Sequence, residues 1–273
     1  MNRTTLLVLL AFGIAGCATP PLGIRAGRPN ATEKMMWSTY LVATKKGLAT
    51  GFVISRRSAP GSGGAAPAMI TAGHLLDSIG SGPLVIAVRE PGKSGDTQLA
   101  LVGVQTPRSG KPFYVRHPRE DVGAFAPGVS AAAASRVLPT FLAENSLGGT
   151  GHELHAGDDV SFLGFPDLLP GTSGGFPVLR SGKVASYPAA QPHAKGTFLI
   201  NADVYPGDSG APVFVCRHGG RPELVGMVIE RVGRNANSFS HFAIAVDATA
   251  IRETLELLAD RERPAAAGIK PPR

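Results

Sequence analysis

The chain has 273 residues, of which 43% are hydrophobic and 17% charged, and its formal net charge is +7. This apolar content excludes a disordered chain, and the length is enough to bury a large core without metals or disulfides. The 35 glycines and 23 prolines argue against an all-helical fold, and the basic residues are scattered without interleaved aromatic residues, so no nucleic-acid partner is expected.

The chain begins with the pattern of an export signal over residues 1–16. Arg3 supplies a positive start, and the apolar run Leu6–Ile14 is too short to cross a bilayer comfortably, which takes about 20 residues. The run leads into Cys17 and resembles the lipobox of bacterial lipoproteins, which implies a lipid on the Cys17 thiol. Ala18 then implies sorting to the periplasmic side of the outer membrane in a Gram-negative cell. An ordinary signal with a chance cysteine stays open.

The mature chain is predicted to hold a lipid-anchored linker over 17–35, one folded domain over 36–262 that is split near 130–150, and a basic tail over 263–273. Short apolar runs separated by Gly, Pro and Ser predict an all-β barrel or sandwich. The predicted strands are Trp37–Ala43, Leu48–Ser55, Ala68–Thr71, Pro83–Val88, Thr97–Val104, Asp121–Phe125, Asp159–Phe162, Val184–Ser186, Thr197–Ala202, Pro212–Cys216, Leu224–Ile229 and Phe239–Ala245.

One helix is predicted near the C-terminus. Asp247 is placed to cap it, and Ile251, Leu255 and Leu258 fall on one helical face. Cys216 closes an apolar run and is predicted to be a buried structural thiol. Because the lipid occupies the chain's other cysteine, no disulfide within the mature chain is expected.

A turn of the sequence Gly207-Asp208-Ser209-Gly210 has the features that a nucleophilic serine needs. Gly207 allows a tight turn in which its own N–H and that of Ser209 converge on an oxyanion. Gly210 leaves the approach to the hydroxyl open. A plain Gly/Ser loop between strands fits the same residues, so this turn alone does not decide the chemistry.

Two further residues complete a catalytic pattern. His74 follows a short apolar strand, and histidine is a base suited to accept the proton of a serine hydroxyl. Asp121 enters an apolar strand, where a carboxylate can orient an imidazole. Taken singly, His74 fits a structural histidine at a strand end and Asp121 a turn residue before a strand.

The chain order His74, Asp121, Ser209 is that of the chymotrypsin arrangement. With Thr71–His74 and Gly207–Gly210, the chain resembles bacterial trypsin-like serine proteases over roughly residues 37–258. The resemblance implies two six-stranded β-barrels of chymotrypsin type with a C-terminal helix. It also implies a triad that forms an acyl-enzyme, and an oxyanion hole from the N–H groups of Gly207 and Ser209.

Departures from the family concern Asp208 and the specificity pocket. Family members that are activated by a freed N-terminus pair it with the aspartate before the nucleophile, but no such start precedes Trp37, so Asp208 needs another partner or is solvated. Asp203 has the offset of a pocket floor that selects Arg or Lys. Arg231 stands at the pocket wall and is an alternative occupant that would neutralise Asp203.

The predicted function is therefore a serine endopeptidase that takes a peptide or protein substrate and is held at the membrane by its N-terminal lipid. No cofactor and no metal is expected, since the spacing of His152, Glu153 and His155 does not fit the helical zinc motif. Two alternatives stay open: a catalytically silent envelope lipoprotein that binds peptides or partners, and an esterase with the same triad. The sequence does not indicate the oligomeric state.

Overall fold

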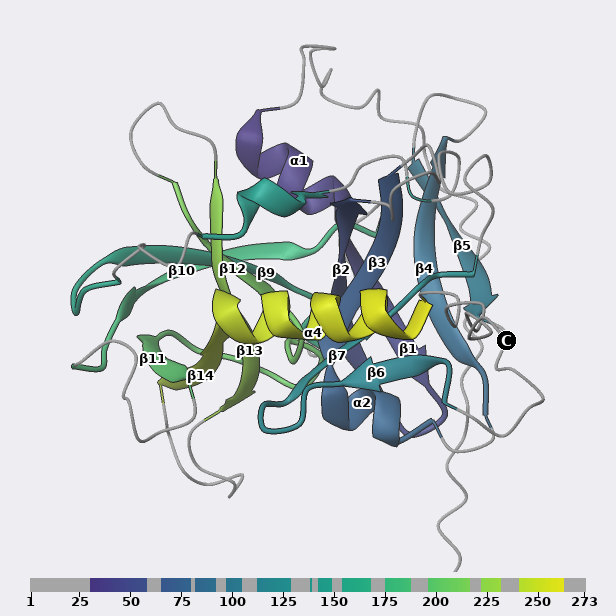
Figure 1. Ribbon diagram of the computed structural model, residues 1–273. Helices are drawn as coiled ribbons and strands as arrows, with labels where there is room; N and C mark the ends of the chain where they lie inside the picture. The colour runs from purple at the N-terminus through teal and green to yellow at the C-terminus, as the bar shows by residue number, and fades with distance from the viewer. Residues whose placement is uncertain are drawn as a thin grey trace, which may run out of the picture.

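The computed structural model describes residues 30–57, 65–79, 82–91, 97–104, 112–128, 138, 142–148, 154–167, 175–187, 196–216, 222–231 and 241–262. Two β units stand side by side, and a C-terminal helix lies across both (Figure 1). The predicted all-β fold of chymotrypsin type with a terminal helix is confirmed, although the N-terminal unit has eight strands where six were expected.

The N-terminal unit is an eight-stranded sheet preceded by a short helix, α1 (Ala31–Trp37). Its main path runs β5-β4-β1-β2-β3-β7-β6 with antiparallel neighbours, and β8 pairs in parallel with β2. The strands are β1 (Thr39–Thr44), β2 (Gly47–Arg57), β3 (Ala65–Ala72), β4 (Leu84–Pro91), β5 (Thr97–Val104), β6 (Tyr114–Arg116), β7 (Val122–Phe125) and β8 (Leu142–Ala143). A short helix, α2 (Gly73–Asp77), follows β3, and a 3-10 turn, η1 (Glu144–Ser146), follows β8.

The C-terminal unit is a closed barrel in the order β10-β11-β14-β13-β12-β9. Closure leaves no strand edge unpaired, and the interior is filled by side chains such as Phe162, Phe198 and Val213. The strands are β9 (Asp159–Gly164), β10 (Val178–Val184), β11 (Thr197–Asn201), β12 (Pro212–Val215), β13 (Glu223–Arg231) and β14 (Phe242–Asp247).

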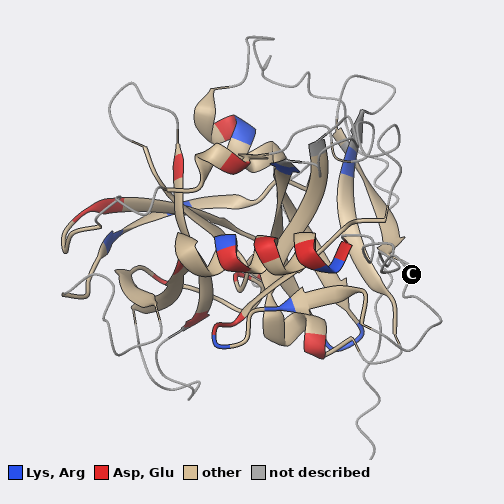
Figure 2. Ribbon diagram, in the orientation of Figure 1, with Lys and Arg blue, Asp and Glu red and all other residues tan. Residues whose placement is uncertain are grey.

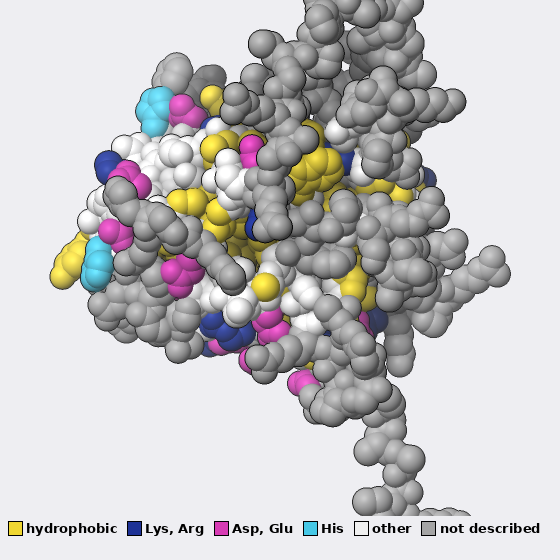
Figure 3. Space-filling view, turned by 90° about the horizontal axis from the view of Figure 1, so that it is seen from above, with side chains coloured by type: hydrophobic (Ala, Val, Ile, Leu, Met, Phe, Trp, Pro, Cys, Tyr) yellow, Lys and Arg dark blue, Asp and Glu magenta, His cyan; other side chains and the backbone are white. Residues whose placement is uncertain are grey.

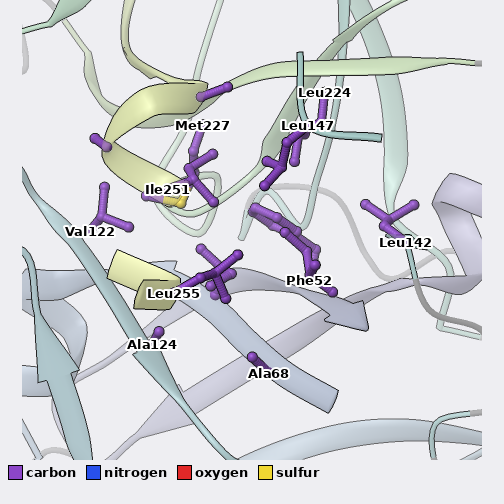
Figure 4. Close-up of a cluster of buried hydrophobic side chains, with 14 of the residues drawn as sticks. Phe52, Ala68, Val122, Ala124, Leu142, Leu147, Leu224, Met227, Ile251 and Leu255 are labelled. Carbon is purple, nitrogen blue, oxygen red and sulfur yellow. The ribbon is translucent and has the colours of Figure 1, made fainter. Parts of the chain in front are cut away.

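A shared hydrophobic core joins the two units. Phe52 from β2 and Met227 from β13 are fully buried in it together with Ile251 and Leu255 of α4 (Ala248–Glu262) (Figure 4). The Asp247 carboxylate accepts a hydrogen bond from the Thr249 N–H at 2.8 Å, so the predicted cap and apolar face of this helix are confirmed. The helix fixes the two units against each other.

Several local predictions differ from the structure. Helix α1 begins inside the predicted linker, because Asn30 and Glu33 form a capping box and Met35 is buried. Strands β6, β8 and most of β10 were not predicted, because their short or polar runs lack an apolar signal. The prediction of a buried Cys216 is wrong: the residue lies just past β12 and is exposed.

Arg89 on β4 is a buried cation that joins distant segments. It is 2% exposed, and its guanidinium donates to backbone carbonyls on both sides of the molecule. Burial lowers the pKa of Arg89 to about 10 and raises the pKa of Tyr40 to about 12, so the pair is a cation beside a neutral phenol at neutral pH. Its acceptors are the carbonyls of Met36, Trp37, Thr39 and Gly175, and it lies over the rings of Trp37, Tyr40 and Phe176.

Charged residues are spread over the described surface. Helix α4 carries both signs along its outer face (Figure 2), and on the face shown in Figure 3 the coloured acidic and basic side chains are interspersed. In the part of the chain that the structure describes, none of the helices has the length and apolar character that crossing a membrane requires.

Candidate active site

His74 and Asp121 meet at the end of β3, where the chain turns into α2. The His74 N–H donates to Asp121 Oδ1 at 2.8 Å, and His74 Nδ1 lies 2.5 Å from Asp121 Oδ2. The Gly73 N–H also donates to the Asp121 carbonyl, at 3.2 Å. With Nδ1 facing the carboxylate, the ring presents Nε2 as the proton acceptor.

The contacts of this pair shift both pKa values. The hydrogen bond that His74 donates to Asp121 raises the pKa of His74 despite partial desolvation, and the Arg116 charge opposes the rise. Desolvation would raise the pKa of Asp121, but its hydrogen bonds and charge interaction with His74 outweigh it, so this pKa is lowered. The pair therefore favours an ionised carboxylate beside a basic imidazole.

Ser209 lies on a tight turn between Val204 and β12. Gly207 has φ +95° and Gly210 has φ +93°, backbone conformations that L side chains rarely adopt. An added Cβ would lie 2.2 Å from the Phe165 carbonyl oxygen at Gly207 and 1.9 Å from the Thr50 carbonyl oxygen at Gly210. Both glycines are required because the turn is pressed against neighbouring backbone.

The turn leaves two N–H groups available. Among the described residues, neither the Gly207 N–H nor the Ser209 N–H donates to a protein acceptor, whereas the Asp208 and Gly210 N–H groups do. The Ser209 hydroxyl donates to the Ile229 carbonyl at 3.1 Å. This hydroxyl must rotate from that carbonyl before it can donate to His74.

Thr50, buried in the middle of β2, holds the turn from the other unit. Its hydroxyl donates to the Gly207 carbonyl at 2.8 Å and accepts from the Phe165 N–H at 3.0 Å. Its own N–H donates to the Ser209 carbonyl at 2.9 Å. The N-terminal unit thus positions the serine of the C-terminal barrel.

Asp208 has Arg180 of β10 as its partner. The two guanidinium nitrogens donate to the two carboxylate oxygens, one of them at 2.7 Å, and the Tyr205 N–H donates to Asp208 at 2.7 Å. The carboxylate is 1% exposed, and Arg180 also lies over the Phe162 ring at 4.7 Å. A bidentate ion pair of this kind satisfies a buried carboxylate without any chain terminus.

The His74, Asp121 and Ser209 side chains line one open cleft of about 500 Å³. Most of its remaining lining is apolar, and Glu230 adds an exposed carboxylate. Its other lining residues are Val204, Tyr205, Pro206, Asp208, Val228 and Ile229.

The other predicted site residues lie elsewhere. Asp203 is not among the cleft-lining residues; its side chain is 53% exposed and lies 2.6 Å from His241 Nδ1. Arg231 ends β13, but its side chain falls outside the described residues, as do Cys17, His152 and Glu153. Within the described ranges, no three His, Cys, Asp or Glu side chains gather in a way that could hold a metal ion.

Three residues around the site, Thr50, Arg116 and Arg180, are not singled out by the sequence patterns. A polar residue inside the apolar strand around Thr50 was a usable signal, because buried hydroxyls need partners. Arg116 and Arg180 lie on strands that the apolar pattern did not predict, so no local signal tied them to the site.

No protein-family model matches the chain, and no curated protein matches it. Solved structures do. The inactive form of Rv3671c from M. tuberculosis H37Rv is 17% identical, with a TM-score of 0.52 over 86% of this chain and 93% of that one. AL20, a thermostable serine protease from an extremophilic microorganism, is 14% identical, with a TM-score of 0.54 over 83% and 99%. Human heparin binding protein is 14% identical, with a TM-score of 0.55 over 86% and 96%.

The chain has the chymotrypsin fold. Identities this low show the fold alone, and a serine protease and a heparin-binding protein share it. Residues of both units line one cleft in this chain, so function has to be argued from the residues of that cleft.

Proposed function

We propose that this chain is a serine endopeptidase. Ser209 attacks the scissile carbonyl while His74 takes its proton and later returns it to the leaving amine. Asp121 holds the imidazole in the tautomer that leaves Nε2 free and stabilises the imidazolium. Water then hydrolyses the acyl-enzyme by the same proton path in reverse.

The observation that carries this proposal is the convergence of His74, Asp121 and Ser209 on one cleft from both units of the fold. The short contact between Asp121 and His74 is the second support. A module that only bound peptides would not need an oriented base beside a hydroxyl on a glycine turn.

The free N–H groups of Gly207 and Ser209 are proposed to bind the tetrahedral oxyanion. Donors of this kind act where charge develops and contribute about 2.7–4 kcal/mol each to transition-state stabilisation. The contacts of Thr50 and Arg180 support the role, because they fix the turn that carries both donors.

For the substrate, we propose an uncharged side chain before the cut. The cleft walls next to Ser209 include Val204, Val228 and Ile229, which favour an apolar group. Asp203 already has His241 as a partner and lies outside the lining, so it does not contact a guanidinium placed in the cleft. The alternative, selection of Arg or Lys by Asp203, predicts that Asp203→Ala lowers kcat/KM on Arg substrates far more than on Ala substrates.

The test of the activity is covalent labelling by a fluorophosphonate, mapped by peptide mass spectrometry. We expect the label on Ser209, and Ser209→Ala to lose it with a fall in kcat on the order of 10⁶. Ser181→Ala, which changes an exposed serine on β10, is the matched control. Undiminished labelling of Ser209→Ala would overturn the assignment. Turnover of simple acyl esters without cleavage of any peptide in a library would favour the esterase.

We also propose that Cys17 carries the lipid that holds the protein at the envelope, a proposal that rests on the sequence around it. Each buried methylene contributes about 0.8 kcal/mol to membrane binding, so two or more acyl chains anchor stably. Metabolic labelling with an alkyne fatty acid tests it, and we expect Cys17→Ser to lose the label. A Cys17→Ser protein that still incorporates the fatty acid would contradict the anchor.

A further inference from the structure

Arg116, the last residue of β6, lies against the outer side of the His74–Asp121 pair. Its Nη2 donates to Asp121 Oδ1 at 3.2 Å, the same oxygen that accepts the His74 N–H. Its Nη1 pairs with Asp77 at the end of α2, and the Tyr114 hydroxyl donates to Asp77 at 3.3 Å. The Asp121 carboxylate is therefore part of a network of hydrogen bonds and ion pairs that connects Tyr114, Asp77, Arg116 and His74.

The backbone makes room for this guanidinium. A Cβ at Gly73 would lie 2.5 Å from Arg116 Nε and 2.7 Å from its Cζ, so a side chain on the first residue of α2 would have to displace the guanidinium. The planar guanidinium therefore lies against the backbone of the residue before His74. Because Asp77 and Asp121 both hold it, its position is fixed from two sides.

We propose that Arg116 is a positioning residue that holds the Asp121 carboxylate against His74 and limits how strongly His74 binds its proton. The inference rests on the proposed function of the pair. Arg116 provides Asp121 with a side-chain donor in addition to the backbone N–H of His74. Unlike that N–H, this donor carries a full positive charge.

The charges around His74 determine in which direction each mutation shifts the pKa of His74. Asp121, which precedes β7, and Glu230 on β13 raise the pKa of His74, and Arg116 on β6 lowers it. Asp77, on the same helix as His74, offsets part of the Arg116 charge. Removing the charge of Arg116 must therefore raise the pKa of His74, and removing the charge of Asp77 must lower it.

The experiment is an NMR titration of the His74 imidazole in the full chain, which does not depend on turnover. In Arg116→Gln, which keeps a donor but loses the charge, we expect the titration midpoint to rise by roughly half a pH unit or more. In Arg116→Lys, which keeps the charge, the midpoint stays near the wild-type value. In Asp77→Asn it falls. A purely structural role for Arg116 would not produce opposite shifts in Arg116→Gln and Asp77→Asn.

An unchanged midpoint in folded Arg116→Gln would overturn the proposal. If that variant does not fold, as judged by circular dichroism, Asp77→Asn decides, and a midpoint that fails to fall would overturn it. The pH dependence of fluorophosphonate labelling is the second measurement: the acid limb should move in the same direction as each midpoint. Absence of labelling in wild type, with the NMR shifts intact, would reject the endopeptidase and leave the role of Arg116 standing.

Discussion

The two halves of the cleft hold their reactive groups in opposite ways. On the N-terminal side, the His74 side chain is 56% exposed and Asp121 24%, and both sit among charges that reach solvent. On the C-terminal side, the Ser209 turn rests on the Asp208–Arg180 pair, in which the carboxylate is 1% exposed. One half leaves its ionisable groups open to solvent, and the other buries its ion pair.

This difference predicts two kinds of response to mutation. Charges near solvent interact through a high effective dielectric, so changing one shifts a pKa without unfolding the protein. A buried ion pair behaves differently, because removing one partner strands the other charge in the interior. The acid–base half should therefore respond in pH profiles and the nucleophile half in stability.

The largest effect is expected from Arg180→Met. It leaves the Asp208 carboxylate buried without its bidentate partner, which costs about 3–5 kcal/mol in the free energy of unfolding. Denaturation by urea measures the loss, and labelling of Ser209 should fall because the turn loses its support.

The double variant Arg180→Met with Asp208→Asn is the control for that prediction. Because Asp208→Asn removes the unpaired buried charge, the double variant should have a higher unfolding free energy than Arg180→Met alone. A double variant as unstable as the sum of both single variants would show that the pair contributes no coupling.

A smaller effect is expected from Thr50→Val, which removes one hydroxyl at nearly constant volume. The Gly207 carbonyl and the Phe165 N–H both lose a partner in a buried place. Loss of these bonds should cost about 1–3 kcal/mol in unfolding free energy and slow the labelling of Ser209. Thr44→Val, at the partly exposed end of β1, is the matched control and should leave the labelling rate unchanged.

In the half of the cleft that holds His74, Glu230→Gln should change only the pH dependence of fluorophosphonate labelling, not stability. The Glu230 charge raises the pKa of His74, so its removal lowers that pKa and moves the acid limb of labelling to lower pH. The expected gain is roughly twofold in labelling rate near pH 6, since the neutral imidazole becomes more abundant. A limb that moves to higher pH would contradict the charge assignment.

The smallest effect concerns stability against pH. The pKa of His74 is raised above 6.5 on folding, so its contribution is complete below that value and is lost as the pH rises through the folded pKa. The pKa of Asp121 is lowered from 3.8, so its contribution is present above that value and is lost as the pH falls. The unfolding free-energy difference between wild type and Asp121→Asn should therefore be largest between about pH 4 and 6.5. Equal differences at pH 5.5 and 9 would contradict the coupling.

Sequence patterns predicted the fold class and most strands, because apolar runs between turn residues are local features. They also predicted the helix that Asp247 caps, where periodicity and cap agree. They missed β10, since its Arg, Ser, Gly and Lys residues resemble a turn, although closure of the barrel makes it a strand.

The residues of the candidate site also divide into those with a local sequence signal and those that only the tertiary structure brings to the site. Residues within short motifs, such as Ser209 between its glycines, were found from spacing. Arg180 and Arg116 contact the site through tertiary pairing, and no spacing rule links β10 to Asp208 or β6 to Asp121. The Asp203 prediction was an offset carried over from the family, and the contact with His241 is a feature that an offset does not contain.

The carbonyls bound by Arg89 have a consequence for how the molecule opens. One guanidinium holds the end of α1 and also Gly175, which lies 86 residues beyond Arg89 and shortly before β10. Release of either segment leaves the buried guanidinium short of acceptors, which is costly for a charge inside the protein. We therefore expect fraying at the N-terminal helix and opening at the entrance to β10 to be coupled, and amide hydrogens in both segments to exchange with similar free energies.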